Sequence, residues 1–305
     1  MPLLFQGSDA YPASDPGPVL TIGNFDGVHV GHAHLVERVV ASAREHGVPA
    51  CAFTFEPPPR AVLEPERRPP RILGIDEKVE RLGALGIDQV VVERFDLHFA
   101  EQPPAWFLDT VLATRLRPSR LVVGHDFRFG KGRAGNIDTV KAAFPDLPLE
   151  QVGALEVDGR TASSSRIREL VANGEVAAAG RLLGRPYGFA GTVSHGAGLG
   201  RGLGFPTANV VPEAELLPAR GVYAAQLQLG DTWLPAVANL GVRPTFEGRT
   251  FGVEVHVLDF EGDLYDQRVR VRFIQRLRSE QRFDGHPALV AQITQDVAQA
   301  RRALE

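Results

Sequence analysis

Short β-rich runs alternate with helical runs along residues 19–173, and this alternation limits the possible folds more than any other feature of the chain. The β-rich runs are almost continuously apolar, as expected of strands that are buried on both faces of a sheet. Strand, helix and strand repeated in this order predict a parallel sheet with helices on both faces. We expect strands at 19–22, 50–55, 89–92, 120–124 and 149–155, and helices from about residue 32 to Gly47, over 105–116 and over 175–186.

The pattern changes near residue 185. Segments 221–241 and 251–273 contain pairs of strands with alternating apolar and polar positions and with glycine or proline turns, which is typical of a small antiparallel barrel or sandwich. We therefore predict two domains, 1–184 and 185–305, and the fold class α/β plus β. The tail 286–304 predicts a final helix that packs on the barrel through Leu289, Ile293, Val297 and Ala300.

Composition limits the class of protein, its cellular location and its partners. With 44% apolar residues and a single cysteine, the chain can fill its cores without disulfide bonds. It has no charged secretory start and no apolar run of the roughly 18 residues needed to span a bilayer, so we expect a cytoplasmic protein with no membrane partner. The formal net charge of -4 argues against nucleic-acid binding by bulk electrostatics, so any phosphate must be held locally.

Two histidines follow the first predicted strand, in the segment GNFDGVHVGH over residues 23–32. His29 and His32 would lie at or just before the first turn of the next helix, where free backbone N–H groups and the helix dipole attract anions. Gly23, Gly27 and Gly31 would let the backbone approach a ligand closely. This arrangement indicates a phosphate site.

Two other interpretations stay open on spacing alone. A zinc site is poorly supported, because no cysteine or third histidine is suitably placed and His34 would lie on another side of the helix. A solvated helix start without a functional role is the remaining possibility.

Several motifs, taken together, resemble those of one family. GNFDGVHVGH resembles the G-x-F-D-G-x-H-x-G-H signature of the nucleotidyltransferase superfamily, in the form found in bacterial bifunctional riboflavin kinase/FAD synthetases. The resemblance extends over essentially the whole chain. The further motifs follow in the order of that family: TFEPPPR (54–60), GHDFRFGKGRAG (124–135), SSSRIREL (163–170), GRGLGFPTAN (200–209) and VEVHVLDFEGDLY (253–265).

The resemblance implies a fold and an activity. A Rossmann-like nucleotidyltransferase domain with a parallel sheet would be followed by a small riboflavin kinase-like antiparallel β-barrel and a terminal helix. The barrel would phosphorylate riboflavin to FMN, and the first domain would adenylylate FMN to FAD with release of pyrophosphate. Mg²⁺ and ATP would be required, and the partners would be small molecules rather than nucleic acid or membranes, with delivery of the product to flavoproteins as a further possibility.

The resemblance also assigns roles to residues of the N-terminal part. His29, His32 and Arg168 would be catalytic and act on the ATP phosphates during adenylyl transfer. Nucleotide and flavin would be bound by Gly23, Asn24, Phe25, Asp26, Gly27, Gly31, Asp126, Ser164 and Ser165.

The sequence departs from the family pattern in three of these motifs. Ser165 stands where the family usually has threonine, a change that keeps the hydroxyl. His125 replaces a tyrosine, Pro58 a histidine and Glu56 an aspartate. These three changes weaken the assignment of flavin contacts to the loops that carry them.

The segment that ends in Pro206, Thr207, Ala208 and Asn209 is interpreted either as a β-turn between strands or as a binding loop. A threonine hydroxyl and an asparagine carbonyl are hard oxygen ligands of the kind that Mg²⁺ accepts. The resemblance makes Thr207 and Asn209 the metal ligands of Mg-ATP, beside Gly204 and Pro206.

Strict alternation over residues 251–257 places Glu254 and His256 on the strand face opposite to its apolar residues. Glu254 is either a solvated residue or a base, and the resemblance assigns to it the removal of the proton from the riboflavin 5′-hydroxyl. The expected apolar face consists of Phe251, Val253, Val255 and Val257.

Three rival functions remain at this point. An enzyme with only one working half would accumulate FMN without FAD. The departures from the family pattern lie in the N-terminal motifs, so the N-terminal half is the one more readily inactive. A flavin- or nucleotide-binding regulator would keep both folds without turnover. An adenylyltransferase for another phosphorylated substrate would leave the kinase-like barrel unexplained.

Overall fold

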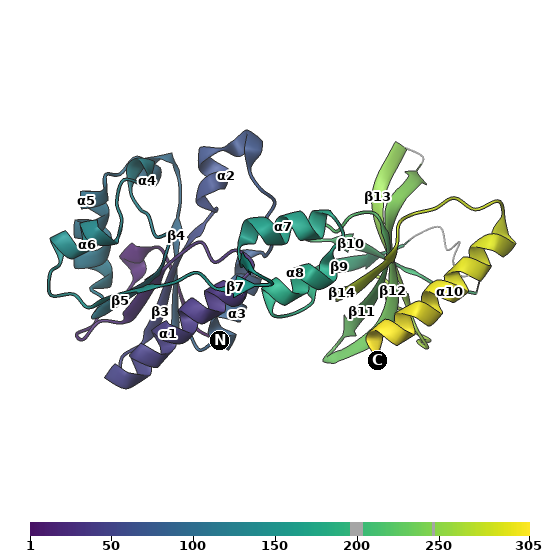
Figure 1. The fold of residues 1–305 in the computed structure, drawn as a ribbon, viewed down its shortest axis with the longest axis horizontal. Helices are drawn as coiled ribbons and strands as arrows, with labels where there is room; N and C mark the ends of the chain where they lie inside the picture. The colour runs from purple at the N-terminus through teal and green to yellow at the C-terminus, as the bar shows by residue number, and fades with distance from the viewer. Residues whose placement is uncertain (196–203, 246–247) are drawn as a thin grey trace. The chain divides into compact units, whose positions relative to one another are not determined.

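The computed structural model describes residues 1–195, 204–245 and 248–305. The chain forms two compact units, Met1–Ser163 and Ser164–Glu305 (Figure 1). Within the described residues, no helix is both long enough and apolar enough to cross a membrane.

The first unit is built on a parallel six-stranded sheet with the strand order β1-β4-β3-β2-β5-β6. This confirms the predicted parallel sheet. Strand β1 was not predicted, because its leucines are largely exposed at the sheet edge and give no burial pattern. The strands are β1 (Leu3–Gln6), β2 (Val19–Ile22), β3 (Ala50–Glu56), β4 (Gln89–Arg94), β5 (Arg120–Gly124) and β6 (Leu149–Val152).

Helices cover both faces of this sheet, as predicted (Figure 1). Alternate strand residues such as Leu20, Phe53 and Leu121 share one core cluster with the helical segments η3 (Phe107–Leu116) and α6 (Ile137–Ala143). The opposite strand positions face α1 (Val30–His46) and α3 (Ile75–Ala84), which bury Val36 and Val39 of α1 and Leu82 of α3.

The predicted helix over 105–116 is present, but its hydrogen bonding differs from expectation. A single turn of α-helix, α5 (Pro104–Trp106), continues as the π-helix η3. The buried residues of η3 are separated by one, three, one and four positions, a spacing that also fits the wider π-helical turn. Periodicity therefore located the helix without deciding its type.

Shorter elements complete the first unit. They connect the strands at the edges of the sheet or lie between the main helices. These elements are η1 (Ser8–Ala10), α2 (Pro59–Leu63), η2 (Pro65–Arg67), α4 (Leu97–Ala100), η4 (Lys131–Arg133), β7 (Glu156–Val157) and β8 (Arg160–Thr161).

The second unit contains a closed barrel with the strand order β10-β13-β12-β11-β14-β9, in which all neighbours are antiparallel. The segments with the antiparallel pattern thus form a barrel and not a sandwich. The strands are β9 (Tyr187–Ser194), β10 (Ala208–Pro212), β11 (Gly221–Leu229), β12 (Thr232–Thr245), β13 (Gly248–Val257) and β14 (Arg268–Arg278).

In the described part of this unit, three helices accompany the barrel: α7 (Ser164–Ala172), α8 (Val176–Leu183) and α10 (His286–Leu304). Helix α10 packs on the outer face of the barrel, where Val297 and Ala300 meet Val222 and Val237. This confirms the predicted terminal helix. Helix α8 packs on β14 and β9, and the compact unit begins at Ser164, whereas the functional boundary at residues 184 and 185 remains a prediction.

Candidate active sites in the two units

The motif that contains both histidines follows a strand at the point where the order of the first sheet reverses. Strands β2 and β5 are neighbours in the sheet but are far apart in the chain, and they form the topological switch point. Ligands of open parallel sheets bind outside the carboxyl ends of the strands at such a point. Residues 23–32, which we call the signature turn, leave β2 there, and residues 125–130 leave β5.

The signature turn has an unusual backbone. Phe25, Gly27 and Val28 have φ values of 47°, 87° and 38°. Positive φ costs glycine little, but for a β-branched residue such as Val28 it is a strained conformation of the kind that concentrates at functional sites. Phe25 and Val28 are buried, and this packing holds the strained turn in place.

Two of the glycines make room for aromatic rings of the turn itself. A Cβ atom on Gly23 would lie 2.9 Å from Cζ of Phe25, and one on Gly31 would lie 3.1 Å from Cε1 of His29. The sequence predicts that these glycines let the backbone approach a ligand closely. The structure adds an internal reason, because side chains at these two positions would push the rings away.

His29 and His32 form a reciprocal cap at the start of α1. The backbone N–H of His32 donates to Nδ1 of His29 at 3.3 Å, and the backbone N–H of His29 donates to Nδ1 of His32 at 3.4 Å. The two rings stack with their centroids 3.7 Å apart. Since each Nδ1 accepts a hydrogen bond, each neutral ring carries its proton on Nε2. The cap thus fixes both tautomers and leaves Nε2–H as the donor.

His32 is a neutral imidazole at pH 7. Burial, with smaller contributions from neighbouring His29 and Lys78, holds the pKa of His32 well below its ordinary value of 6.5. A neutral histidine at this position donates a hydrogen bond to an anion without releasing a proton. The pair therefore has the form of a preorganised donor site.

A buried lysine, which the sequence analysis missed, lies beneath the signature turn. Lys78 of α3 is 2% exposed, and its Nζ lies 3.5 Å from Oγ1 of Thr54, which donates to the carbonyl of Asn24. Burial lowers the pKa of Lys78, while Asp26 and Glu56 act in the opposite direction. In the sequence, Lys78 stands in a charged helical segment, a context that does not distinguish it from a solvated residue.

Asp26 binds backbone rather than facing outward. It is 3% exposed, and its carboxylate accepts from the backbone N–H groups of Ile72 and Leu73 at 3.1 Å and 3.3 Å. These bonds tie the signature turn to the segment before α3. Asn24, in contrast, is exposed at the surface of the turn.

The other predicted residues of the N-terminal motifs are placed as follows. Asp126 is exposed in the loop after β5, whereas Phe127 and Phe129 are buried in the core cluster. Ser164, Ser165 and Arg168 lie in the first turns of α7, which belongs to the second compact unit. Their role at the ATP phosphates is therefore a proposal.

In the barrel, three polar residues lie in register on neighbouring strands. Asn209 of β10 is directly opposite Glu254 of β13, and Glu254 is directly opposite Asn239 of β12. Residues directly opposite each other project from the same face of the sheet. Asn209 thus belongs to a strand, because β10 begins at Ala208, while most of the segment interpreted as a β-turn or binding loop lies outside the described residues.

The alternation predicted for β13 is confirmed for the described side chains. Val253, Val255 and Val257 are buried inside the barrel, while Glu254 and His256 project from the outer face. The side chain of Phe251 lies outside the described residues, as does most of the glycine-rich part of the motif over 200–209.

Glu254 lines a cavity of about 370 Å³ on the outer face of the barrel, which we call the barrel cavity. Glu254, Asn239 and Thr207 line it together with Glu280. The volume suits a drug-sized ligand with a few fixed polar groups. Most of the wall is apolar and comes from Phe205, Val222, Val237, Phe283, Leu289 and Ile293.

Thr207 also lines a second, smaller cavity of about 70 Å³ beside Tyr265. Pro206, which precedes Thr207, is bound to β13, because Nδ1 of His256 makes a 2.7 Å hydrogen bond with the carbonyl oxygen of Pro206. Gly204 has a φ of 84°, which requires glycine, and it is exposed. Thr207 therefore lies where the two cavities meet.

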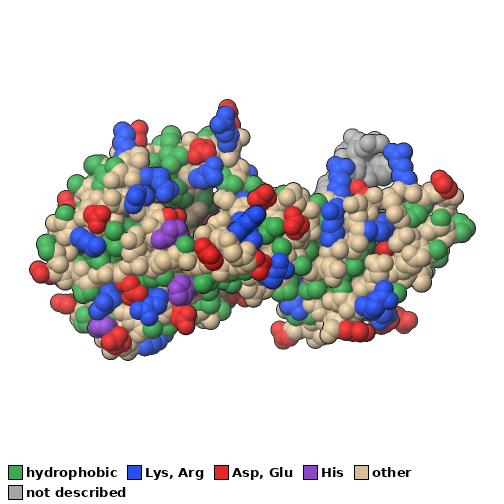
Figure 2. Space-filling view, viewed as in Figure 1, with side chains coloured by type: hydrophobic (Ala, Val, Ile, Leu, Met, Phe, Trp, Pro, Cys, Tyr) green, Lys and Arg blue, Asp and Glu red, His purple; other side chains and the backbone are tan. Residues whose placement is uncertain are grey.

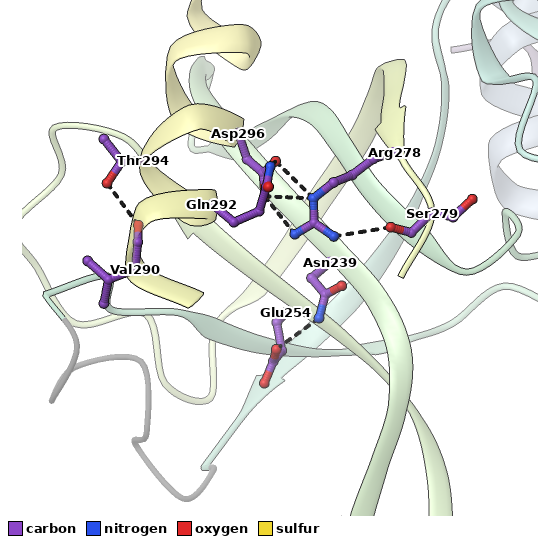
Figure 3. A network of polar contacts seen from close by, with 8 residues as sticks. All are labelled: Asn239, Glu254, Arg278, Ser279, Val290, Gln292, Thr294 and Asp296. Carbon is purple, nitrogen blue, oxygen red and sulfur yellow. Dashed lines mark hydrogen bonds and ion pairs between the residues drawn. The ribbon is translucent and has the colours of Figure 1, made fainter. Parts of the chain in front are cut away.

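An ion pair fastens α10 over the barrel cavity (Figure 3). Nε of Arg278 donates to Asp296 at 2.9 Å and Nη2 donates at 2.8 Å, a two-pronged arrangement. Gln292 adds a hydrogen bond of 3.0 Å to the same carboxylate. Asp296 is 2% exposed, so this pair holds a buried charge in place.

We expect Asp296→Ala to destabilise the protein by about 3–5 kcal/mol, because it leaves the Arg278 guanidinium partly buried without its partner. Urea unfolding measured by circular dichroism checks this value. Asp259→Ala is the matched control, because it breaks the exposed pair of Asp259 with Arg301, which water screens, and should change little. Equal effects of the two variants would show that the buried pair does not stabilise α10.

Comparisons with known proteins match both units. The family model described as FAD synthetase matches residues 11–166, and the model described as riboflavin kinase matches residues 183–304. A bifunctional riboflavin kinase/FMN adenylyltransferase from Pseudomonas fluorescens is 43% identical over 289 residues, covering 93% of this chain and 92% of the relative. The protein of the same name from Escherichia coli K12 is 39% identical over 292 residues, covering 95% and 93%.

A solved structure resembles this chain over nearly its full length. A protein from Streptococcus pneumoniae, titled a macrolide-efflux protein, has a TM-score of 0.90 and 30% sequence identity to this chain. The match covers 98% of this chain and 99% of that protein.

Proposed function

The chain belongs to the family of bifunctional riboflavin kinase/FMN adenylyltransferases, and from this premise we propose how its residues share the two reactions. The protein phosphorylates riboflavin to FMN with ATP and adenylylates FMN with a second ATP, which yields FAD and pyrophosphate. We assign phosphorylation to the barrel and adenylyl transfer to the parallel sheet, with the functional boundary at residues 184 and 185.

We assign the kinase site to the barrel because of the barrel cavity and the residues that line it. Glu254 and Thr207 line one cavity, so a carboxylate base and a hydroxyl suited to Mg-ATP face the same space. Apolar side chains such as Phe205, Phe283 and Ile293 provide a wall for the flavin ring. The small cavity that Thr207 also lines would receive part of the nucleotide.

In this site, Glu254 removes a proton from the riboflavin 5′-hydroxyl as that oxygen attacks the γ-phosphorus of ATP and ADP leaves. Thr207 and Asn209 supply hard oxygen atoms, and this donor set fits Mg²⁺. A bound Mg²⁺ would neutralise charge on the phosphate oxygens. The side chains orient the two substrates so that the attack is in line.

In the first unit, we assign the adenylyltransferase site because of the two histidines. Their Nε2–H groups would donate to the ATP phosphates at the amino end of α1, where charge builds up as pyrophosphate leaves. The FMN phosphate attacks the α-phosphorus directly, so no covalent intermediate with the protein is needed. Asp26 would support the turn rather than touch the nucleotide, because its carboxylate binds backbone N–H groups.

Ser164, Ser165 and Arg168 would complete this site. The carbonyl of Ala162 lies 3.5 Å from the position of a Cβ atom on Gly31, so the chain passes the start of α1 two residues before Ser164. The hydroxyls and the guanidinium on α7 are donors suited to phosphate oxygens, in line with the role that the resemblance gives them. Asp126 and Asn24, both exposed at the switch point, would face nucleotide or flavin.

We further infer a cytoplasmic location, with small molecules as partners and no nucleic acid. On the face drawn in Figure 2, basic and acidic side chains are interspersed rather than gathered into a basic patch. Together with the net charge of -4, this distribution favours local phosphate sites.

Incubation of the purified protein with riboflavin, ATP and Mg²⁺ tests the proposed function, with riboflavin, FMN and FAD separated chromatographically over time. FMN that appears first and is then converted to FAD is the expected result. FMN alone would confine activity to the barrel, and no product would favour a binding protein.

We expect Thr207→Val to raise the Mg-ATP concentration needed for half-maximal FMN formation by about tenfold or more, because the isosteric valine lacks the oxygen ligand. Asn209→Leu should act in the same direction. Titrations of Mg-ATP measure the change, and Thr192→Val on the exposed face of β9 is the control. An unchanged Mg-ATP requirement would overturn the ligand assignment, and conversion of supplied FMN to FAD should be unaffected.

A further inference from the structure

The polar row Asn209–Glu254–Asn239 contains a residue with no role in the proposal above. Asn209 and Asn239 lie directly opposite Glu254 on its two neighbouring strands. We propose that Asn239 is a positioning residue that holds the carboxylate of Glu254 in the orientation needed for proton removal. This inference rests on the proposed role of Glu254 as the base.

The geometry supports a direct effect of Asn239 on Glu254. Nδ2 of Asn239 donates to Oε2 of Glu254 at 3.3 Å, and both side chains line the barrel cavity (Figure 3). Both residues stand on strands of a closed barrel and are directly opposite in the ladder, so their Cβ atoms are held about 5 Å apart. Sites on such elements are positioned more accurately than sites on loops.

A donated N–H group restricts a carboxylate without consuming its basic capacity. A carboxylate has two oxygen atoms with about four lone-pair positions, so a bond at Oε2 leaves acceptor positions for the substrate hydroxyl. Glu254 is only half-buried, and the hydrogen bond from Asn239 restricts the rotamers that its side chain adopts. A general base must come within hydrogen-bond distance of the proton that it removes, so a fixed rotamer increases the productive fraction.

An amide is also the appropriate donor electrically. A cation beside Glu254 would form an ion pair and make the carboxylate a weaker base. Arg278 lines the same cavity, but its guanidinium is bound to Asp296 by the buried pair described above. Asn239 supplies a neutral donor to Glu254, and the guanidinium of Arg278 is held by Asp296.

The test compares three variants of Asn239 in the full chain, with FMN formation as the readout. Asn239→Leu keeps the approximate size and removes the donor, Asn239→Asp adds a like charge, and Asn239→Gln keeps an N–H donor. We expect kcat to fall about tenfold in the leucine variant, the factor that corresponds to one net hydrogen bond, and further in the aspartate variant. Glutamine should recover part of the loss.

Two readouts separate positioning from a structural role. The KM values for riboflavin and Mg-ATP should change less than about twofold in Asn239→Leu, because uniform binding is not removed. Recovery of kcat by Asn239→Gln is the second readout, because a merely structural role would not depend on an N–H donor. Gln226→Leu, which removes an amide from the neighbouring strand β11, is the matched control and should leave kcat unchanged.

A double variant makes the test decisive. If Asn239 acts through Glu254, then Asn239→Leu should cause no further loss of rate in the Glu254→Gln background. An additional loss there, or a normal kcat in the single variant, would overturn the inference. Full activity of Glu254→Gln alone would instead contradict the proposed base, so the two failures are distinguishable.

Discussion

Replacing His32 by alanine is expected to lower the rate of FAD formation from FMN about 100-fold or more, while riboflavin phosphorylation stays nearly intact. The reason is the loss of a preorganised neutral donor from the phosphate site, an effect comparable to the removal of one oxyanion-hole donor. Separate assays with riboflavin or FMN as the flavin substrate measure the two activities.

The control for this experiment must separate the donor from the helix cap. His29→Asn keeps a side chain that can cap α1 but removes the ring donor, so we expect it to lose FAD formation without a large loss of stability. His34→Ala, in the same helix, should retain both activities. Equal loss of both activities in the His32 variant would mean that the histidines support folding rather than a separate site.

The second large effect is expected in the barrel. Glu254→Gln should reduce riboflavin phosphorylation by about 100-fold or more, the contribution of a positioned general base, because the amide cannot accept the hydroxyl proton. Adenylylation of supplied FMN should continue, because that reaction is assigned to the other unit. Initial rates of FMN formation at saturating riboflavin and Mg-ATP give the measurement.

A second carboxylate in the same cavity provides the comparison. Glu280 also lines the barrel cavity, but it is exposed and follows the end of β14, whereas Glu254 is half-buried within β13. Glu280→Gln should therefore retain most of the kinase rate. The opposite result, with Glu280 essential and Glu254 dispensable, would transfer the role of base to Glu280.

Sequence patterns located most of the main elements, because burial leaves a periodic record. The apolar runs at 19–22 and 120–124 became β2 and β5 with the same bounds, and the final helix spans the predicted 286–304. The short edge strand β1 and the π-helix η3 left no such record. In β1 little is buried, and in η3 the apolar spacing suits two kinds of helix.

The sequence by itself determined the family, the order of the two units and the candidate residues, because these properties reside in local motifs and in burial periodicity. Only the tertiary structure showed how distant residues combine. It set Asn239 opposite Glu254, bound Arg278 to Asp296 and buried Lys78 beneath the signature turn. Strand register and the burial of a charge depend on contacts between segments far apart in the chain, and local spacing does not record those contacts.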